Sequence, residues 1–464
     1  MKDARNERSP GAPRDGRREE GADSRERRPG PPGNLPTRFR VGHCRELLEE
    51  ILARPTTPAD LTISRFFAAR RYLGSHDRGF IADTVYGVLR ELITLRFLLD
   101  ELLSLLAPED EAAPALFGYL VEHHAALDAD EILDLLELSD REAEWIERTM
   151  KEAPERIAAL PEPERSGVQY GLPSWFAARL IEQRGAGDAG ALMGALGEQA
   201  PITLRANRLV ATPERLAGAL ADRGIAVSPG RWAPDALLLL KRLNANAIPE
   251  FKSGWFEMQD EGSQLLSTLL DPHPNWNVFD ACAGAGGKAL HMAAIMKGRG
   301  AITAHDVNER RLMEIRPRMR RSGAQNIRVM SHDLYLEREA QLAGKYDAVM
   351  IDAPCSGAGV LRRNPGARLG FDEGMVARLV ALQGEILRDY ARLVKPGGLL
   401  LYATCSLLRE ENEEQVERFM ADAPGWSIER APAPEEMITP EGFFRSFPHL
   451  HGTDAFFGAL LRRA

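Results

Sequence analysis

The chain has 464 residues and a formal net charge of −9, and 44% of its residues are hydrophobic. This length exceeds what one ordinary hydrophobic core holds and so predicts several domains, while the negative charge argues against nonspecific coating of nucleic acid, which depends on cations that neutralise phosphates. No apolar run approaches the ~20 residues that span a bilayer, and the arginine-rich N-terminus lacks the apolar segment of a secretory signal, so we expect a cytoplasmic protein without a membrane partner.

The N-terminal third is predicted to contain a polar tail followed by an all-α domain. Residues 1–38 are mainly Arg, Gly, Pro, Asp and Glu, which bury too little surface to offset the entropy of ordering, so we expect a disordered tail. Residues 41–150 carry apolar side chains at helical spacing, as at Ile81 and Val85, and are predicted to be helical. Residues 155–170, rich in Pro, Glu and Arg, are interpreted as a linker.

The segment 171–255 mixes helical and strand patterns and is predicted to be a small α+β domain with a linking or RNA-binding role. Its expected elements are two helices and two short strands, at residues 175–184, 213–223, 202–204 and 236–240. Arg205 and Arg208 follow the first of these strands and are candidate RNA contacts.

From residue 256 to residue 464 strand and helix patterns alternate, which predicts a parallel sheet covered by helices on both faces. The strands are expected at 277–280, 301–305, 327–331, 346–351, 399–403 and 456–461, and the helices at 288–296, 309–322, 375–394 and 410–420. In such sheets ligands bind beyond the carboxyl ends of the strands, so we expect the functional residues there.

A glycine-rich segment from Asp280 to Lys288 follows the first of these strands. Its spacing is GxGG, which is not the GxGxxG of dinucleotide-binding loops. Asp306 ends the second strand, where such acids accept hydrogen bonds from ribose hydroxyls, and Asp333 follows the third strand. This pattern favours a nucleoside ligand that needs no pyrophosphate clamp, and it suits S-adenosylmethionine better than NAD.

Two cysteines follow neighbouring strands near the end of the predicted sheet. Asp352 and Cys355 come directly after strand 346–351, and Cys405 ends the next strand. A free cysteine is often a small buried hydrophobic residue, and for Cys355 alone this alternative stays open. Two thiols beside an acid and a methyl-donor site match the methylation of cytosine at carbon 5, because a thiolate must first add to carbon 6 to make carbon 5 nucleophilic.

The motifs FDACAGAGGK, MIDAPCSGAGVLRRNP and YATCSLLREEN resemble those of the Sun/Fmu (RsmB) family of S-adenosylmethionine-dependent RNA cytosine-5 methyltransferases. The resemblance covers about residues 41–464 and includes WFEMQDEGSQ and TDAFF, while DRGF and YGVLR in the helical region resemble the NusB antitermination factors. It implies an all-α NusB-like N-terminal domain, a small α+β middle domain and a C-terminal α/β class I, Rossmann-like methyltransferase domain. The chain departs from the family pattern at Gly284 and Ala285, where CAAPGGK is usual, and at Ala455, where glycine is usual.

The resemblance also implies roles for the candidate residues. Cys405 would be the nucleophile, Cys355 would assist product release, and Asp352 would hold the cytosine beside the cofactor's methyl group. A free thiol titrates near pH 8.5, so Cys405 needs activation, and Lys288 is a candidate for it. S-adenosylmethionine would be bound by a loop, with Asp306 on the ribose, Asp333 near the adenine and Asp352 at the methyl group; the loop residues are Cys282, Ala283, Gly284, Ala285, Gly286, Gly287 and Lys288.

Basic residues supply candidate contacts for an RNA partner. The expected contacts are Arg362, Arg363, Arg205 and Arg78, and helix 309–322 adds Arg310, Arg311, Arg316, Arg318, Arg320 and Arg321, which are alternatively a solvated helix face. The expected substrate is small-subunit (16S) rRNA. A tRNA cytosine-5 methyltransferase and a noncatalytic RNA-binding assembly factor remain alternatives, and an NAD-dependent oxidoreductase is a remote third. We expect a monomer. We also expect no metal, because four scattered cysteines form neither a disulfide framework nor a CxxC metal site.

Overall fold

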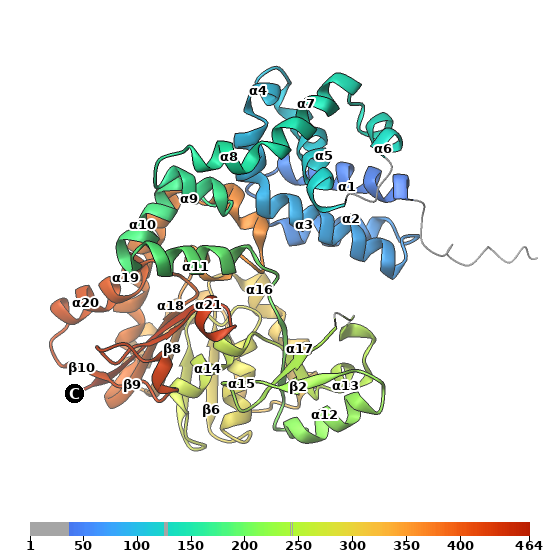
Figure 1. The fold of residues 1–464 in the computed structure, drawn as a ribbon. Coiled ribbons are helices and arrows are strands. Elements are labelled where there is room, and N and C mark those ends of the chain that lie inside the picture. Colours follow the sequence, from blue (N-terminus) through green and yellow to red (C-terminus); the bar gives the residue numbers. More distant parts are fainter. Residues whose placement is uncertain (1–36, 125–128, 242, 244) are drawn as a thin grey trace, which may run out of the picture.

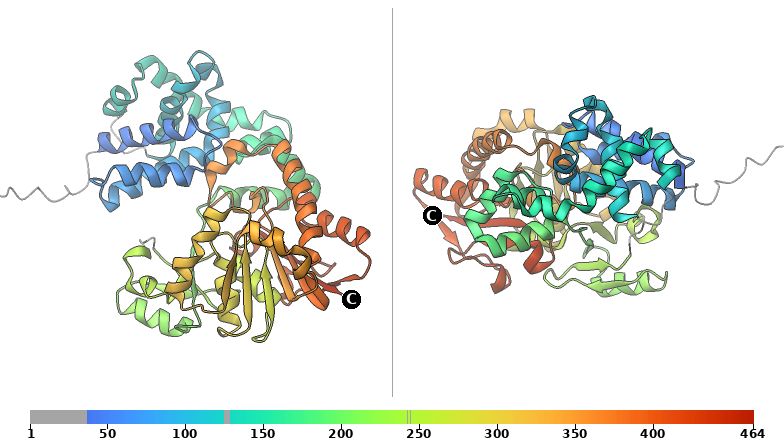
Figure 2. Two further views of the ribbon diagram at one scale, coloured as in Figure 1. Left: turned by 180° about the vertical axis from the view of Figure 1, so that it is seen from behind. Right: turned by 45° about the horizontal axis from the view of Figure 1, so that its top comes forward.

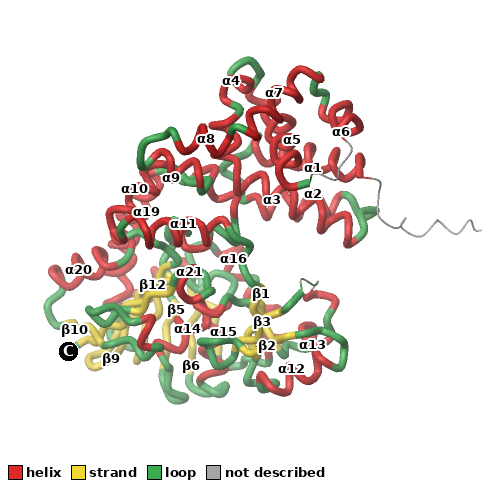
Figure 3. Tube along the Cα trace, viewed as in Figure 1, coloured by secondary structure: helices red, strands yellow, loops and turns green. Residues whose placement is uncertain are grey.

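A computed structural model describes residues 37–124, 129–241, 243 and 245–464 of the chain. The described residues form a helical part, a small mixed part and a large α/β part, which Figures 1 and 3 show as separate groups of elements. The tail predicted at 1–38 lies outside the described residues except for its last two positions, which begin the first helix. Within the described ranges, no helix is long and apolar enough to cross a membrane.

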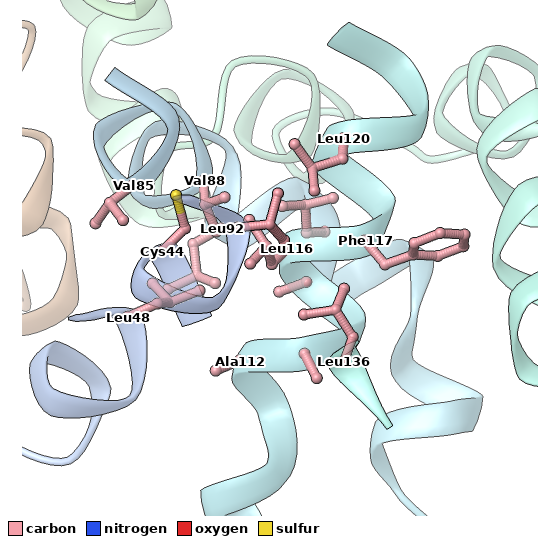
Figure 4. Packing of buried hydrophobic residues seen from close by; sticks show 14 of the residues in the cluster. Cys44, Leu48, Val85, Val88, Leu92, Ala112, Leu116, Phe117, Leu120 and Leu136 are labelled. Carbon is pink, nitrogen blue, oxygen red and sulfur yellow. The ribbon is translucent and has the colours of Figure 1, made fainter. Parts of the chain in front are cut away.

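The helical part begins with seven α-helices, as predicted for 41–150. They are α1 (Thr37–Leu52), α2 (Ala59–Ala69), α3 (Ser75–Leu98), α4 (Asp100–Leu103), α5 (Ala112–His123), α6 (Ala129–Leu136) and α7 (Asp140–Lys151). Their apolar faces meet in one core, in which Cys44 packs near Leu48 and Val85 (Figure 4). Burial raises the pKa of the Cys44 thiol to about 12, so this cysteine serves packing. The resemblance of this part to NusB stays a prediction.

Residues 155–170, which are interpreted as a linker from the sequence, contain two packed helices. Helices α8 (Ala153–Ala158) and α9 (Glu164–Gln169) occupy most of this segment and join the helical part to the rest of the chain. Val168 is buried, and its carbonyl accepts a hydrogen bond of 2.5 Å from the Thr94 hydroxyl. The composition of this segment, rich in Pro, Glu and Arg, does not indicate that it packs against the helical part. The contact that shows the packing comes from α3, more than 70 residues away in sequence.

The middle part contains an antiparallel sheet with the order β2-β3-β1-β4. Its elements are β1 (Ile202–Ala206), α12 (Pro213–Ala221), β2 (Val227–Pro229), β3 (Ala236–Leu239), α13 (Pro249–Lys252) and β4 (Phe256–Met258). Strand β4 belongs to this sheet although it lies beyond the predicted domain boundary at 255. The boundary was placed too early because β4 pairs with β1, some fifty residues earlier, and a local sequence pattern does not reveal such a pairing. Helices α10 (Ser174–Arg184) and α11 (Ala186–Gly197) pack instead on the α/β part.

The α/β part is built on a sheet with the order β10-β12-β9-β8-β5-β6-β7, to which β11 is added beside β12. The strands are β5 (Asn277–Asp280), β6 (Ala301–His305), β7 (Ile327–Met330), β8 (Tyr346–Asp352), β9 (Val394–Thr404), β10 (Trp426–Glu429), β11 (Phe444–Ser446) and β12 (Phe456–Arg463). Strands β5 to β9 are parallel, as predicted, but β10, β11 and β12 pair antiparallel. Residues 447–455 connect β11 to β12. This connection is too short for a parallel pair, which needs a crossover of a dozen or more residues, so the two strands pair antiparallel.

Helices cover both faces of this sheet, which Figure 2 shows from behind and from above. They are α14 (Glu261–Leu270), α15 (Gly287–Ile295), α16 (Glu309–Met313), α17 (Ile315–Ser322), α18 (His332–Leu342), α19 (Glu373–Ala391), α20 (Glu413–Asp422) and α21 (Pro448–His451). The single helix predicted at 309–322 is divided between α16 and α17, because Pro317 lacks the amide hydrogen that would bond to residue 313. The chain adds strands on one side of β5 and then on the other, so a ligand crevice is expected at the carboxyl ends of β5 and β8.

Candidate active site

The loops that follow β8 and β9 run side by side at the carboxyl edge of the sheet. Asp352, the last residue of β8, pairs in register with Ala403 of β9. The Ala353 amide then donates a hydrogen bond of 2.8 Å to the Ala403 carbonyl, which extends the pairing past the strand. This register brings the segment that contains Cys355 against the segment that contains Cys405.

The two thiols are in direct contact. The Sγ atoms of Cys355 and Cys405 lie 3.3 Å apart, and the Cys405 amide also donates to the Cys355 sulfur at 3.3 Å. The hydrogen bond with Cys405 and burial together raise the pKa of Cys355 well above its ordinary value. Cys355 therefore holds its proton around neutral pH, next to a second sulfur that is partly accessible. The prediction that these cysteines meet at one edge of the sheet agrees with this geometry.

Sequence reasoning missed the buried carboxylate of Glu411, which lies beneath both cysteine segments. It comes from a short 3-10 helix, Arg409–Glu411, and has no exposed surface. Its oxygens accept hydrogen bonds from the amide and hydroxyl of Ser356 and from the hydroxyl of Ser406, the residues that directly follow the two cysteines. The sequence gives only a weak signal for Glu411, because this residue is one of four consecutive polar residues in REEN and its partner Ser356 is 55 residues away.

The glycine-rich segment faces these loops from the end of β5. Gly286 has a φ of +83°, and a Cβ atom there would lie 2.2 Å from Ile315, so glycine is required at the start of α15. The Gly284 amide donates to Asp306 Oδ2 at 2.8 Å, which links the loop to the end of β6. Lys288 Nζ lies 2.5 Å from Asp352 Oδ2, which links the loop to the end of β8. The glycine-rich segment is therefore linked to both acids that were predicted at the cofactor site, through Gly284 to Asp306 and through Lys288 to Asp352.

Arginines hold the outer side of this segment. Arg318 Nη1 donates to the Ala285 carbonyl at 2.8 Å, and Arg205 Nη1 donates to the Gly287 carbonyl at 2.7 Å. Glu257 in β4 accepts hydrogen bonds from both Arg318 and Arg321. Arg205 is 2% exposed. Its side chain therefore supports the loop from the middle part of the molecule and is not available for the RNA contact that the sequence suggested.

Asp280 is a buried acid without a full partner. It has no exposed surface, and neither carboxylate oxygen receives a well-formed hydrogen bond from the described part of the chain. Burial and the neighbouring charge of Asp352 raise the pKa of Asp280 to about 8, while Lys288 and the Cys282 amide lower it to a smaller extent. A cationic ligand would supply the missing partner. The sulfonium and ammonium groups of S-adenosylmethionine are such cations, so the residues present fit this cofactor.

The remaining predicted residues lie in other surroundings. Asp333 is exposed in the first turn of α18, at the carboxyl end of β7. Arg362 is 4% exposed and bonds to Asp454 at 2.7 Å, so it is buried where an RNA contact was predicted. Arg363 also bonds to Asp454 but remains partly exposed. Arg78 lies in α3, where its guanidinium donates to the Leu73 carbonyl at 3.0 Å.

The fold and the site together define a class I methyltransferase. The sheet places a glycine-rich loop after its first parallel strand, an acid after its second and a polar site at the point where strand order reverses. Residues 267–462 match the family described as 16S rRNA methyltransferase RsmB/F, and residues 172–246 match the ferredoxin-like domain of RsmF/B-like methyltransferases.

Curated relatives carry the same description. The chain is 30% identical over 418 residues to the probable ribosomal RNA small subunit methyltransferase B of Synechocystis sp., covering 84% of this chain and 92% of that protein. It is 36% identical over 266 residues to the probable ribosomal RNA small subunit methyltransferase B of Bacillus subtilis, covering 56% and 59% of the two chains. The chain therefore belongs to the RsmB/F family of 16S rRNA methyltransferases, which confirms the resemblance seen in its motifs.

Solved structures confirm the predicted fold class. The crystal structure of PH0851 is 26% identical, has a TM-score of 0.77, and covers 93% of this chain and 100% of its own. A methyltransferase homologue from Pyrococcus horikoshii is 27% identical, has a TM-score of 0.56, and covers 64% of this chain and 97% of its own. The helical part, the small middle part and the Rossmann-like methyltransferase part are therefore arranged as in known proteins.

Proposed function

We propose that this protein transfers a methyl group from S-adenosylmethionine to carbon 5 of a cytosine in RNA, and that the RNA is small-subunit (16S) rRNA. The observation that carries the proposal is the pair of thiols, 3.3 Å apart, at the ends of the strands that also present Asp352. The substrate class follows from the names of the relatives and of the matching family.

The thiols suit the two halves of the reaction. Cys405, as a thiolate, adds to carbon 6 of the cytosine, and the electron pair of the carbon 5–carbon 6 double bond makes carbon 5 nucleophilic. Carbon 5 then takes the methyl group, whose bond to the cofactor's sulfur breaks so that S-adenosylhomocysteine is left. Carbon 5 loses its proton to a base, the bond between carbon 6 and the Cys405 sulfur breaks to return the thiolate, and the double bond forms again. Cys355 lies against the Cys405 sulfur and assists this release. Asp352 holds the cytosine ring and stabilises its protonated form.

The cofactor would be bound by the segment Cys282 to Lys288 at its methionine end, by Asp306 at the ribose and by Asp333 near the adenine. When bound, S-adenosylmethionine supplies an electrophilic methyl group. Asp280 supports this assignment because it is a buried acid whose carboxylate oxygens receive no well-formed hydrogen bond from the described residues. The ion pair of Lys288 with Asp352 keeps the cofactor loop and the base-holding acid in one arrangement.

The RNA must present a single unstacked base to these thiols. Sequence-specific RNA recognition commonly targets loops and single strands, and enzymes that act on a base take it out of its stack. Exposed arginines on α16 and α17 lie next to the cofactor loop and are proposed to contact phosphates; they are Arg310, Arg311, Arg316 and Arg320. Arg363 is partly exposed and remains a candidate contact.

The test is a methylation assay with tritiated S-adenosylmethionine on unmodified 16S rRNA and on tRNA, followed by nucleoside analysis of the labelled RNA. Label in 5-methylcytidine from 16S rRNA is expected. Label confined to tRNA would assign the other substrate, label in another nucleoside would contradict carbon 5 chemistry, and binding of rRNA without label would indicate a noncatalytic assembly factor.

A further inference from the structure

The carboxylate of Glu411 accepts four hydrogen bonds, three of which come from the two cysteine segments. Oε1 accepts from the Ser356 amide at 2.8 Å and from Gln383 Nε2 at 2.9 Å. Oε2 accepts from the Ser356 hydroxyl at 2.5 Å and from the Ser406 hydroxyl. Ser356 and Ser406 each follow a cysteine directly, so one carboxylate fixes the chain immediately beyond both sulfurs.

The surroundings of Glu411 hold it rigidly in turn. Its own carbonyl accepts a hydrogen bond of 2.7 Å from the Tyr402 hydroxyl of β9. Gln383 is fully buried in α19, and its amide nitrogen bonds both to Glu411 and to the Pro354 carbonyl at 2.9 Å. Pro354 immediately precedes Cys355, so the Cys355 segment is held on both sides of its sulfur.

We propose that Glu411 is a positioning residue, which sets the distance between the two sulfurs by fixing the loops that carry them. Four donors converge on a carboxylate that has no exposed surface, two on each oxygen, so the protein itself occupies its acceptor sites and fixes its orientation. Charge-assisted hydrogen bonds of this kind are short and strong, so they restrain both loops more tightly than neutral contacts would. The role is additional to the thiol chemistry and rests on the proposed function for its catalytic consequence.

The same carboxylate affects the protonation of the site. Its negative charge is one of the contributions that raise the pKa of Cys355, after the hydrogen bond with Cys405 and burial. The titratable groups next to this cluster include the two thiols, Glu411 itself and the Tyr402 hydroxyl, with Asp352 at the start of the Cys355 loop. The hydrogen bonds of Glu411 position the two loops, and its negative charge additionally raises the pKa of Cys355.

The variants for the test are Glu411→Gln and Glu411→Ala. Glutamine keeps the shape and one oxygen acceptor, whereas alanine removes all four contacts. The matched control is Glu410→Ala, because Glu410 is the neighbouring residue and bonds at 2.6 Å to Arg179 in α10 instead of to the cysteine segments. If Glu411→Ala does not fold, the double variant Ser356→Ala with Ser406→Ala removes the hydroxyl donors and leaves the carboxylate in place.

The first readout needs neither RNA nor cofactor. Dibromobimane alkylates two neighbouring thiols, each of which displaces one bromide, and mass spectrometry identifies the peptides bridged between Cys355 and Cys405. The expected rate of bridging falls in the order wild type, Glu411→Gln, Glu411→Ala, while Glu410→Ala matches wild type. Equal rates in wild type and in folded Glu411→Ala would overturn the proposal.

The second readout is methyl transfer under saturating RNA and cofactor. Misplacement of reacting groups by about 1 Å costs about 100-fold in rate, so kcat of Glu411→Ala should fall about 100-fold, with partial rescue in Glu411→Gln and an unchanged Kd for S-adenosylmethionine. If bridging is slower in Glu411→Ala but the wild-type protein transfers no methyl group, the positioning role stands and the proposed function is rejected. Normal kcat in Glu411→Ala would reject the positioning role alone.

Discussion

The Lys288 ammonium nitrogen lies 2.5 Å from Oδ2 of Asp352 and so joins the glycine-rich segment after β5 to the end of β8. The positive charge of Lys288 is therefore paired with the Asp352 carboxylate. The sequence had suggested instead that Lys288 activates Cys405. The glycine-rich segment and the acid that is proposed to hold the base are therefore coupled by one ion pair. Loss of the ammonium should disturb both of them.

Lys288→Met should weaken S-adenosylmethionine binding and lower kcat. A hydrogen bond to a charged group contributes about 1.5 kcal/mol or more, so the Kd should rise roughly tenfold. Isothermal titration calorimetry measures the Kd, and Lys345→Met, which removes an exposed lysine just before β8, is the matched control. Equal affinities in Lys288→Met and wild type would show that the ion pair does not shape the cofactor site.

Asp280 should make the stability of the free protein depend on pH. Its pKa is raised to about 8 in the folded protein, mainly by burial, whereas an ordinary aspartate titrates near 4. Between these values the folded state holds a proton that the unfolded chain has lost, so the contribution of Asp280 to stability decreases as pH rises from about 4 to about 8. The Asp280→Asn variant should therefore gain stability relative to wild type over this range, on the order of 1.4 kcal/mol for each unit of pKa difference.

Urea unfolding of both proteins at pH 5 and pH 8 measures this effect. Asp347 provides a control of opposite sign: burial opposes its ionisation, but hydrogen bonds from the Asn277 amide and Lys395 lower its pKa below the ordinary value. Asp347→Asn should therefore be less stable than wild type by about the same amount at pH 5 and at pH 8, because both values lie above the range in which Asp347 titrates. A stability difference for Asp280→Asn that stays constant with pH would contradict the raised pKa.

Arg362→Ala should destabilise the fold without selectively weakening RNA binding. Arg362 and Asp454 are both almost fully buried, and removal of one partner from a buried ion pair costs about 3–5 kcal/mol. Arg316→Ala and Arg320→Ala should instead leave stability unchanged and reduce RNA affinity and its salt dependence, because these side chains are exposed. Thermal unfolding and RNA titrations at two salt concentrations separate the two effects. A normal melting temperature for Arg362→Ala together with weakened RNA binding would restore the RNA contact predicted from sequence.

Strands β5, β6 and β8 were predictable because each is a short, mainly apolar run that ends at or directly before an acid, whereas β10 and β11 were not predicted. Strands 277–280 and 301–305 agree with the structure at both ends, and the cysteines follow strands whose order places them together. Local patterns of this kind also located Asp352 and the glycine-rich segment. The fold class was accordingly accessible from the sequence.

The missed features depend on partners that are distant in sequence. Glu411 bonds to Ser356, 55 residues away, and Arg205 bonds to Gly287, 82 residues away. A run of charges does not reveal which arginine is buried, so Arg205 and Arg362 were assigned to RNA although each bonds inside the protein.

The central claim is that Cys405 forms the covalent bond to the RNA and Cys355 allows its release. The most direct measurement is a denaturing gel of each alanine variant after incubation with RNA and S-adenosylmethionine, with calorimetry to confirm that both variants still bind the cofactor. Cys355→Ala should remain covalently attached to the RNA as a slowly migrating band, and Cys405→Ala should show no band and no methyl transfer. A covalent band with Cys405→Ala would reverse the two roles, and its absence from both variants would contradict covalent catalysis.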